Sequence, residues 1–220
     1  ESYTLCLHDA LPILEEPHVW ATLTARDAVI FKDNDFEIFL DPDGDTHNYY
    51  ELEVNAFETE WDLILLKPYH DQSKVAVDSW DIPGLITKVH VNGTINDPSD
   101  MDKGWSVEIA IPWKALEECA PNFYPQEGEQ WKVNFSRVQW DVDIVEEQYV
   151  KTDSPEFNWV WSPQGLIYMH MPDLWGLVQF TEASPEQGNV EFKVSEIDPI
   201  KWALRQVYYR QRNYFFKKDH

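Results

Sequence analysis

Two short stretches in which apolar and polar residues alternate, separated by an acidic turn, constrain the fold most strongly. Residues 36–41 place Phe, Ile and Leu at every second position, and residues 49–55 continue the pattern with Tyr, Leu and Val. A period of two residues indicates a β-strand that buries one face. The sequence Asp-Pro-Asp-Gly-Asp at residues 41–45 interrupts the pattern as a turn. Together they predict an antiparallel hairpin.

Further stretches also combine alternation with β-branched and aromatic residues, and Gly, Pro, Asn or Asp lies between them. They are residues 61–66, 86–91, 105–111, 131–140 and 175–180. Many short strands joined by turns are typical of two packed antiparallel sheets. We therefore expect an all-β, two-sheet sandwich over residues 14–181, with branched residues at alternate positions in its core. The expected core residues are Ile38, Leu40, Val54, Val107, Ile109 and Ile111.

Two helices are expected, one inside the sandwich and one after it. Residues 112–118 begin with a proline, which suits the first turn of a helix. Residues 182–220 have the pattern of a linker followed by an amphipathic helix, in which Asp198 and Pro199 form the N-terminal cap. We expect this helix to pack on the sandwich. Docking to a partner or to a membrane surface is the alternative.

The first 13 residues are expected to be foreign to the domain. Residues 3–13, Tyr-Thr-Leu-Cys-Leu-His-Asp-Ala-Leu-Pro-Ile, resemble the read-through translation of a sequencing adapter, a contaminant of metagenomic assemblies. The native sequence would then begin near Leu14, with its first strands and any signal peptide lost. We expect residues 3–13 to pack loosely, because they were not selected with this core. An ordinary apolar strand is the alternative.

Composition excludes several classes of protein. The formal net charge of −23 would repel nucleic acid, whose binding depends on Lys and Arg. Hydrophobic residues make up 43% of the chain and aromatic residues 15%, which excludes disorder, and no apolar run is long enough to span a bilayer. Cys6 and Cys119 stand far apart and outside any zinc-binding spacing, so we expect neither a disulfide framework nor a zinc site.

Polar side chains should gather on the sheet face opposite the core. If residues 36, 38 and 40 face the core, strand alternation places Glu37 on the other face, and Glu53 and Asn55 join it from the neighbouring strand. Arg137 lies in another strand and could balance their charge while donating two hydrogen bonds. These groups could bind the hydroxyls of a sugar. A solvated face with an ion pair explains the pattern equally well.

Aromatic side chains supply the second component of a sugar site, because their faces stack on the C–H faces of pyranose rings. Most of the 11 tryptophans are expected in the core. Trp61, Trp159 and Trp161 lie near turns and are therefore candidates for exposed platforms.

Several motifs, in order, resemble the family 9 carbohydrate-binding modules, which belong to the large group of DOMON-like, jelly-roll β-sandwiches. The motifs are DFEIFLDPDGD at residues 35–45, YYELEVN at 49–55, GWSVEIAIPW at 104–113, VNFSR at 133–137 and WGLVQF at 175–180. The resemblance covers about residues 14–181. It implies non-catalytic binding of a neutral oligosaccharide or polysaccharide, in support of a fused or co-encoded glycoside hydrolase. It also implies a secreted, periplasmic or cell-surface location in a bacterium.

The resemblance also suggests roles for particular residues. In that family two aromatic side chains clamp a terminal sugar. Phe31 takes the position of the first clamp, and Trp159 or Trp161 is expected to be the second. Glu37 occupies the carboxylate position and Asn55 the amide position. A basic residue that the family places near Glu53 is absent, which leaves the preferred sugar open.

The acidic turn is a candidate calcium site. Asp41, Asp43 and Asp45 have the alternate spacing of oxygen ligands, and Gly44 permits the bend. The family resemblance favours structural calcium here, whereas spacing alone fits a plain acidic turn equally well.

Two other functions compete with sugar binding. A glycoside hydrolase could use Glu37 and Glu53 as its catalytic pair, although the sequence gives no evidence of a deep cleft or of a raised pKa. A haem-binding redox domain could use His170 with Met169 or Met171. Adjacent residues of a strand would point to opposite faces, which argues against this haem site.

Overall fold

The structure is a computed structural model that describes residues 4–6, 13–71, 74–165 and 168–218. The chain divides into two compact units, Glu1–Phe180 and Thr181–His220. The first unit consists of β-sheets. The second contains a short 3₁₀ turn, η4 (Pro185–Gln187), and the helix α1 (Asp198–Lys218). Among the helices of the described residues, none has the length and apolar character needed to cross a membrane.

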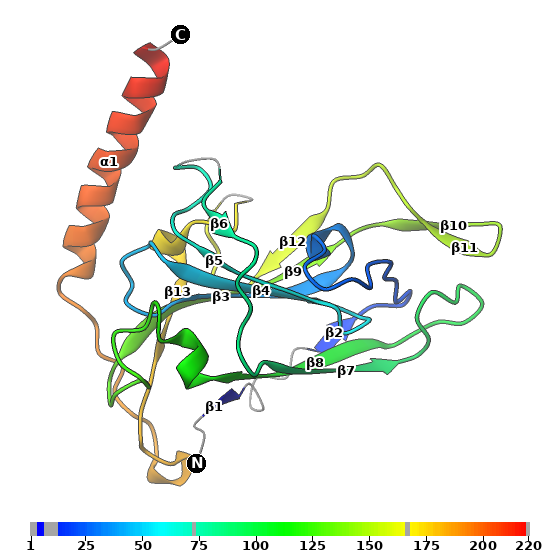
Figure 1. The fold of residues 1–220 in the computed structure, drawn as a ribbon, viewed down its shortest axis with the longest axis horizontal. Coiled ribbons are helices and arrows are strands. Elements are labelled where there is room, and N and C mark those ends of the chain that lie inside the picture. The colour runs from blue at the N-terminus through cyan, green and yellow to red at the C-terminus, as the bar shows by residue number, and fades with distance from the viewer. Residues whose placement is uncertain (1–3, 7–12, 72–73, 166–167, 219–220) are drawn as a thin grey trace. The chain divides into compact units, whose positions relative to one another are not determined.

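The larger sheet has seven strands in the described part of the chain, and every neighbouring pair is antiparallel (Figure 1). Their order is β12-β9-β3-β4-β5-β6, and β13 also pairs with β9. The strands are β3 (Asp35–Asp41), β4 (Tyr49–Asn55), β5 (Glu60–Leu65), β6 (Ala76–Val77), β9 (Gln130–Gln139), β12 (Phe157–Val160) and β13 (Gly176–Gln179). In this order β3 and β4 lie in the middle of the sheet.

The smaller sheet is built around one long strand. The strand β8 (Gly104–Pro112) pairs with β7 (Ile86–Asn92), and also with the two short strands β1 (Thr4–Cys6) and β2 (Ile13–Glu15). A separate hairpin is formed by β10 (Val142–Val145) and β11 (Gln148–Lys151). The predicted two-sheet antiparallel sandwich with a C-terminal helix is confirmed.

The main core lies between the two sheets. All six predicted core residues are buried in one apolar cluster, together with Trp105 and Trp131. Phe36 and Phe135 stack in this layer with a ring separation of 6.2 Å. Burial of such side chains contributes about 1.5–3 kcal/mol each relative to exposure, which is the main force that holds the sheets together.

The opposite face of the larger sheet is buried as well. Every residue of β3 and β4 is buried, and a second apolar cluster covers their outer face. This cluster consists of Ile30, Phe39, Tyr49, Trp61, Leu63, Leu65, Val75 and Trp175. The side chains of β3 and β4 therefore alternate between two buried layers, whereas a solvated outer face was one of the two interpretations of the sequence. The functional site lies in the second layer.

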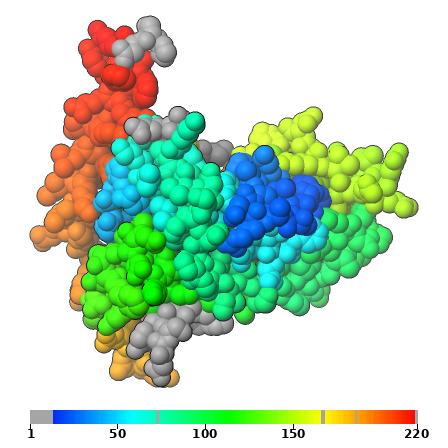
Figure 2. All heavy atoms as spheres, viewed as in Figure 1, coloured from blue at the N-terminus to red at the C-terminus, as the bar shows by residue number. Residues whose placement is uncertain are grey.

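The segment that leads into β3 helps to cover this face. It contains the 3₁₀ turn η1 (Ile30–Lys32), and Figure 2 shows the segment in blue beside the yellow-green β10–β11 hairpin. His18 Nδ1 lies 2.9 Å from the hydroxyl of Tyr149, and Lys151 Nζ donates a 2.7 Å hydrogen bond to the carbonyl of Lys32. The hairpin thus holds in place the segment that carries Phe31.

Several elements differ from their predicted form. The predicted helix at residues 112–118 is the short 3₁₀ turn η2 (Trp113–Leu116), with Pro112 as its cap. The strands β6, β10, β11 and β12 were not predicted. Glu146 and Glu147, which connect β10 to β11, both have positive φ, 51° and 63°. Such a turn usually carries Asn-Gly, so the sequence contained no hairpin signal there.

The N-terminal residues contribute backbone pairing to the smaller sheet. Thr4, Leu5 and Cys6 pair with Pro112, Ile111 and Ala110, and β2 starts at Ile13. Residues 1–3 and 7–12 lie outside the described part of the chain. Loose packing of residues 3–13, and their foreign origin, stay predictions.

Candidate functional site

A row of four side chains crosses the covered face of the larger sheet. Glu37 on β3 is paired in register with Ser136 on β9 and with Glu53 on β4, and Glu53 is paired in turn with Trp61 on β5. Directly opposite residues of antiparallel strands have Cβ atoms about 5 Å apart. Glu51 lies two residues from Glu53 and so shares its face. Glu37 and Glu53 therefore share one face of the sheet, and Trp61, one of the four aromatic residues expected at its rim, lies beside Glu53.

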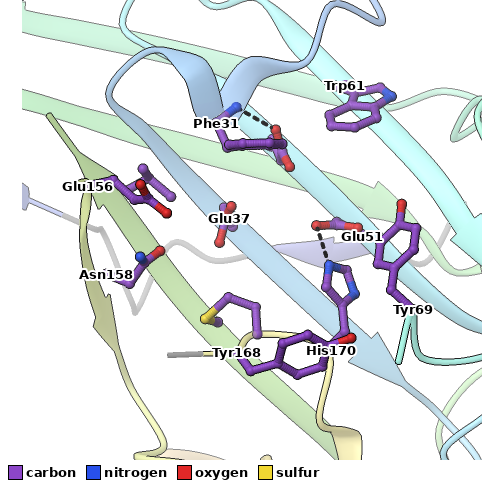
Figure 3. A pocket seen from close by; sticks show the side chains of 12 residues that line it. Phe31, Glu37, Glu51, Trp61, Tyr69, Glu156, Asn158, Tyr168 and His170 are labelled. Atoms are coloured by element: carbon purple, nitrogen blue, oxygen red, sulfur yellow. Dashed lines mark hydrogen bonds and ion pairs between the residues drawn. The ribbon is translucent and has the colours of Figure 1, made fainter. Parts of the chain in front are cut away.

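A cavity of about 190 Å³ lies above this row. The carboxylates Glu37, Glu51 and Glu53 line it from the central strands. Figure 3 shows Phe31 and Trp61 on one side of Glu37 and Glu51, and Tyr168 and His170 on the other. The remaining lining residues are Tyr69, Val138, Glu156, Asn158 and Met169. The space is comparable to one pyranose ring with its hydroxyl groups.

The carboxylates of this floor are buried without a cationic side chain in the cavity lining. Burial raises the pKa of Glu37 to about 7. Burial, reinforced by the charges of neighbouring carboxylates, also raises the pKa of Asp35, Glu51 and Glu53 well above the ordinary range. Among the described lining residues there is no Lys or Arg. A ligand that donates hydrogen bonds or carries positive charge would stabilise these groups.

Some polar atoms of this row have no partner within the described structure. They are Glu37 Oε2, Trp61 Nε1 and Ser136 Oγ. By contrast, Glu53 Oε2 accepts a 2.8 Å hydrogen bond from the backbone N–H of Phe31. Leaving a buried polar group unsatisfied costs about 1–3 kcal/mol, so groups of this kind are typical of sites that bind a ligand.

His170 completes one wall of the cavity as a neutral side chain. Its Nδ1 lies 2.9 Å from the hydroxyl of Tyr49, and its Nε2 lies 3.8 Å from Glu51. Burial, together with the charge of His70, lowers the pKa of His170 to about 3. Tyr69 packs edge-on against the ring at a centroid distance of 4.5 Å. The imidazole is therefore a fixed, uncharged member of an aromatic wall.

Asn55 shares the predicted face but is used inside the protein. Its Nδ2 donates to the carbonyl of Leu23 and to Asp33, and its Oδ1 accepts from the backbone N–H groups of Phe57 and Thr59. The side chain is fully buried and does not line the cavity. The expectation that Asn55 binds a sugar hydroxyl is therefore wrong, because its donors and acceptor hold the turn after β4.

Arg137 lies on the opposite face from Glu37, so the prediction that they share a face is wrong. It pairs with Phe36, which faces the inter-sheet core. Its guanidinium donates to the carbonyl of Glu15 at 3.2 Å and lies 3.3 Å from the carboxylate of Glu16. The sequence did contain a signal for this placement, because Trp131, Val133 and Phe135 have the same parity as Arg137 in β9 and lie in or against the inter-sheet core.

The two predicted clamp tryptophans lie outside the cavity. Trp159 pairs with Arg137 and shares its face, where 66% of the side chain is exposed. Trp161 packs against Phe135 at 5.7 Å and covers Gly176, where a Cβ atom would lie 2.3 Å from its ring. Asn158, between them, lines the cavity instead. Neither tryptophan therefore lines the cavity, and a clamp role for Trp159 or Trp161 stays a prediction.

The sequence prediction missed several lining residues. Glu51 could have been found, because it has the same strand parity as Glu53. Tyr69, Tyr168 and His170 come from irregular segments, where periodicity gives no signal. The expectation that Met169 and His170 point to opposite faces is also wrong, since this segment is not a strand and both side chains line the cavity.

The acidic turn after β3 has the geometry that its spacing suggested. Asp41, Asp43 and Asp45 bring one carboxylate oxygen each within 4.8 Å of one another. Asp41 is buried and accepts hydrogen bonds from the backbone N–H groups of Gly44 and Thr46. The residues present fit an oxygen-coordinated cation. Calcium at this turn stays a prediction.

Comparisons with known proteins identify the fold. No family model and no curated protein matches the chain. A solved protein from Bacteroides uniformis, provisionally described as carbohydrate-binding, matches with a TM-score of 0.51 and 19% identity, over 76% of this chain and 69% of its own. The two proteins share a fold.

Matches with lower TM-scores include a family 9 carbohydrate-binding module from Caldicellulosiruptor kristjanssonii. Its complex with cellotriose has a TM-score of 0.45 at 15% identity, over 84% of this chain and 73% of its own. Its complex with glucose has a TM-score of 0.45 at 16% identity, over 82% and 72%.

Proposed function

We propose that this chain is a non-catalytic carbohydrate-binding module and that the cavity above Glu37 is its sugar site. The observation that carries the proposal is the combination of buried, unpartnered polar atoms with aromatic walls in one ring-sized cavity. Glu37 Oε2 would accept a hydrogen bond from a sugar hydroxyl, and Trp61 Nε1 would donate one. Phe31 and Tyr168 would contact the C–H faces of the ring.

Binding fits the geometry better than hydrolysis does. Glycoside hydrolases place their two carboxyl groups on either side of the scissile bond. Glu37 and Glu53 are instead directly paired neighbours on one sheet, so both lie on the floor beneath any ligand. Glu53 is also fixed by the N–H of Phe31 and is only 1% exposed. The pair is therefore placed to recognise a sugar from one side.

The wider setting belongs to the same proposal. The ligand would be a neutral oligosaccharide or polysaccharide, and the module would bring a fused or co-encoded glycoside hydrolase to that polymer. A secreted, periplasmic or cell-surface location in a bacterium would follow from this role. The fold shared with a protein described as carbohydrate-binding supports the proposal.

Titration calorimetry with glucose and cello-oligosaccharides would test the site. We expect Glu37→Ala to weaken binding about 10- to 100-fold, because a charge-assisted hydrogen bond contributes about 1.5–3 kcal/mol. Trp159→Ala removes a large aromatic side chain outside the cavity and should leave affinity unchanged. Loss of binding in the Trp159 variant, with full binding in the Glu37 variant, would move the site to the other face of the sheet.

A further inference from the structure

Three buried carboxylates converge beneath the cavity. Asp35, Glu37 and Glu53 each bring one carboxylate oxygen within 4.8 Å of the other two. Their exposed fractions are 0%, 4% and 1%. Like charges at this spacing repel one another strongly in a medium of low dielectric constant. This cluster is separate from the acidic turn of Asp41, Asp43 and Asp45.

Among the described residues around the cavity, no positively charged side chain offsets the negative charge of these carboxylates. Arg137, on the neighbouring strand β9, faces the other side of the sheet and pairs with Glu16. His170 is a neutral member of the wall. Asp35 Oδ1 accepts a 3.3 Å hydrogen bond from the N–H of Val138, whereas Asp35 Oδ2 and Glu37 Oε2 have no partner in the described structure.

A side chain that is not acidic also points to a ligand here. Ser136 lies directly opposite Glu37 on the same face of the sheet. It is 98% buried, and its hydroxyl lies close enough to Glu37 to lower the pKa of that carboxyl, yet no hydrogen bond of ordinary geometry satisfies Ser136 Oγ among the described residues. A hydroxyl oxygen beside three carboxylates completes a set of hard oxygen donors, which is the kind of set that calcium prefers.

The position of Asp35 distinguishes a metal ion from a larger cationic ligand. Asp35 is fully buried and does not line the cavity, whereas Glu37 and Glu53 do. The amine of a sugar ring in the cavity would meet Glu37 and Glu53 without reaching Asp35. A single ion can settle between all three. Calcium binds oxygens at about 2.3–2.6 Å, so oxygens on opposite sides of it are about 5 Å apart, in line with the observed spacing.

We propose that a divalent cation of the calcium class binds between Asp35, Glu37 and Glu53 and forms part of the cavity floor. Ser136 Oγ supplies a further oxygen ligand. The side of the ion that faces the cavity takes hydroxyl oxygens of the ligand. This last step rests on the proposed sugar-binding function, whereas the cation site itself does not.

The test starts from a parent protein that carries Asp43→Asn and Asp45→Asn, which removes two of the three carboxylates of the acidic turn and leaves only the buried Asp41 there. Calorimetric titration of this metal-free parent with calcium chloride should show one binding event. Adding Glu37→Gln should weaken it at least tenfold. Adding Glu147→Gln instead, at the exposed turn between β10 and β11, is the matched control and should leave calcium affinity unchanged.

Melting temperatures supply a readout that a purely structural role of Glu37 would not produce. In EDTA, Glu37→Gln should melt at a higher temperature than the parent, because it removes repulsion. In millimolar calcium the order should reverse, because the parent alone gains a bound ion.

A parent without a calcium isotherm, or a variant with the same isotherm as the parent, would overturn the cation site. Stabilisation by glucosamine in EDTA without any response to calcium would assign the cluster to an amine.

Sugar titrations with the same parent separate the two proposals. Sugar affinity at least tenfold higher in calcium than in EDTA supports coordination of hydroxyls by the ion. Equal affinity in both overturns that coordination and leaves the sugar-binding function standing. Absence of sugar binding in both contradicts the proposed function, while the calcium isotherm still decides whether the cation site exists.

Discussion

His170 shows how burial, together with a neighbouring histidine, can set the charge of a side chain. The unfolded chain binds a proton at this histidine below about pH 6.5, whereas the folded protein does so only near pH 3. The folded state therefore loses stability relative to the unfolded state as the pH falls from 6.5 towards 3. Above pH 6.5 both states are neutral at this position and the contribution disappears.

We expect His170→Gln to remove this pH dependence. Between pH 7.5 and pH 4.5 the wild type should lose about 2–3 kcal/mol more free energy of unfolding than the variant, which corresponds to about two pKa units. Urea unfolding at the two pH values measures the difference, and titration of the carboxylates is common to both proteins. His90→Gln, at an exposed position of β7, is the control. Equal pH dependence of wild type and His170→Gln would contradict burial of a neutral imidazole.

Asn55 provides a second expectation for a single residue. Asn55→Ala should lower the free energy of unfolding by about 2–4 kcal/mol, because it leaves the N–H groups of Phe57 and Thr59 without their acceptor and removes one donor each from the carbonyl of Leu23 and from Asp33. Urea unfolding at pH 7.5 measures this loss. A variant as stable as the wild type, with weaker sugar binding, would return Asn55 to the ligand site.

Strand positions could be predicted from the sequence, whereas strand partners could not. Alternation located β3, β4, β7, β8 and β9 to within a residue or two, and it placed Glu37 and Glu53 on one face. It also predicted the core residues correctly. Arg137 was misplaced although its parity within β9 matches that of the core residues Trp131 and Val133. Trp159 was misplaced because the sequence does not give the pairing register between its strand and β9. Tyr168 and His170 belong to an irregular segment whose path depends on tertiary packing.

The β10–β11 hairpin gives an expectation at the level of an element. Its two-residue turn holds Glu146 and Glu147 at positive φ, a conformation that costs about 1–2 kcal/mol for most residues. Replacing the pair by Asn-Gly should stabilise the protein by about 1 kcal/mol, which a thermal melt would detect. A lower melting temperature would show that the glutamates form contacts that outweigh the backbone strain.

Over the whole β unit, the larger sheet separates two buried layers with different tasks. One face packs against the smaller sheet and holds the unit together. The other face carries the acidic floor, covered by η1, by the segment after β5 and by the segment before η3. A sequence with one polar and one apolar strand face suggests a solvated surface. Here the chain returns over the polar face three times, which no local pattern reveals.

The floor of the cavity is built from paired strands, whereas its walls come from separate segments of the chain. This difference affects how such a protein can evolve. Glu37, Glu53 and Ser136 are fixed by strands whose other side is the core, so a change there alters recognition and folding together. Phe31, Tyr69 and Tyr168 come from three segments that are distant in sequence. Insertions or exchanges in one such segment leave the other two in place. New ligand preferences are therefore more accessible to a lineage through its loops than through its sheet.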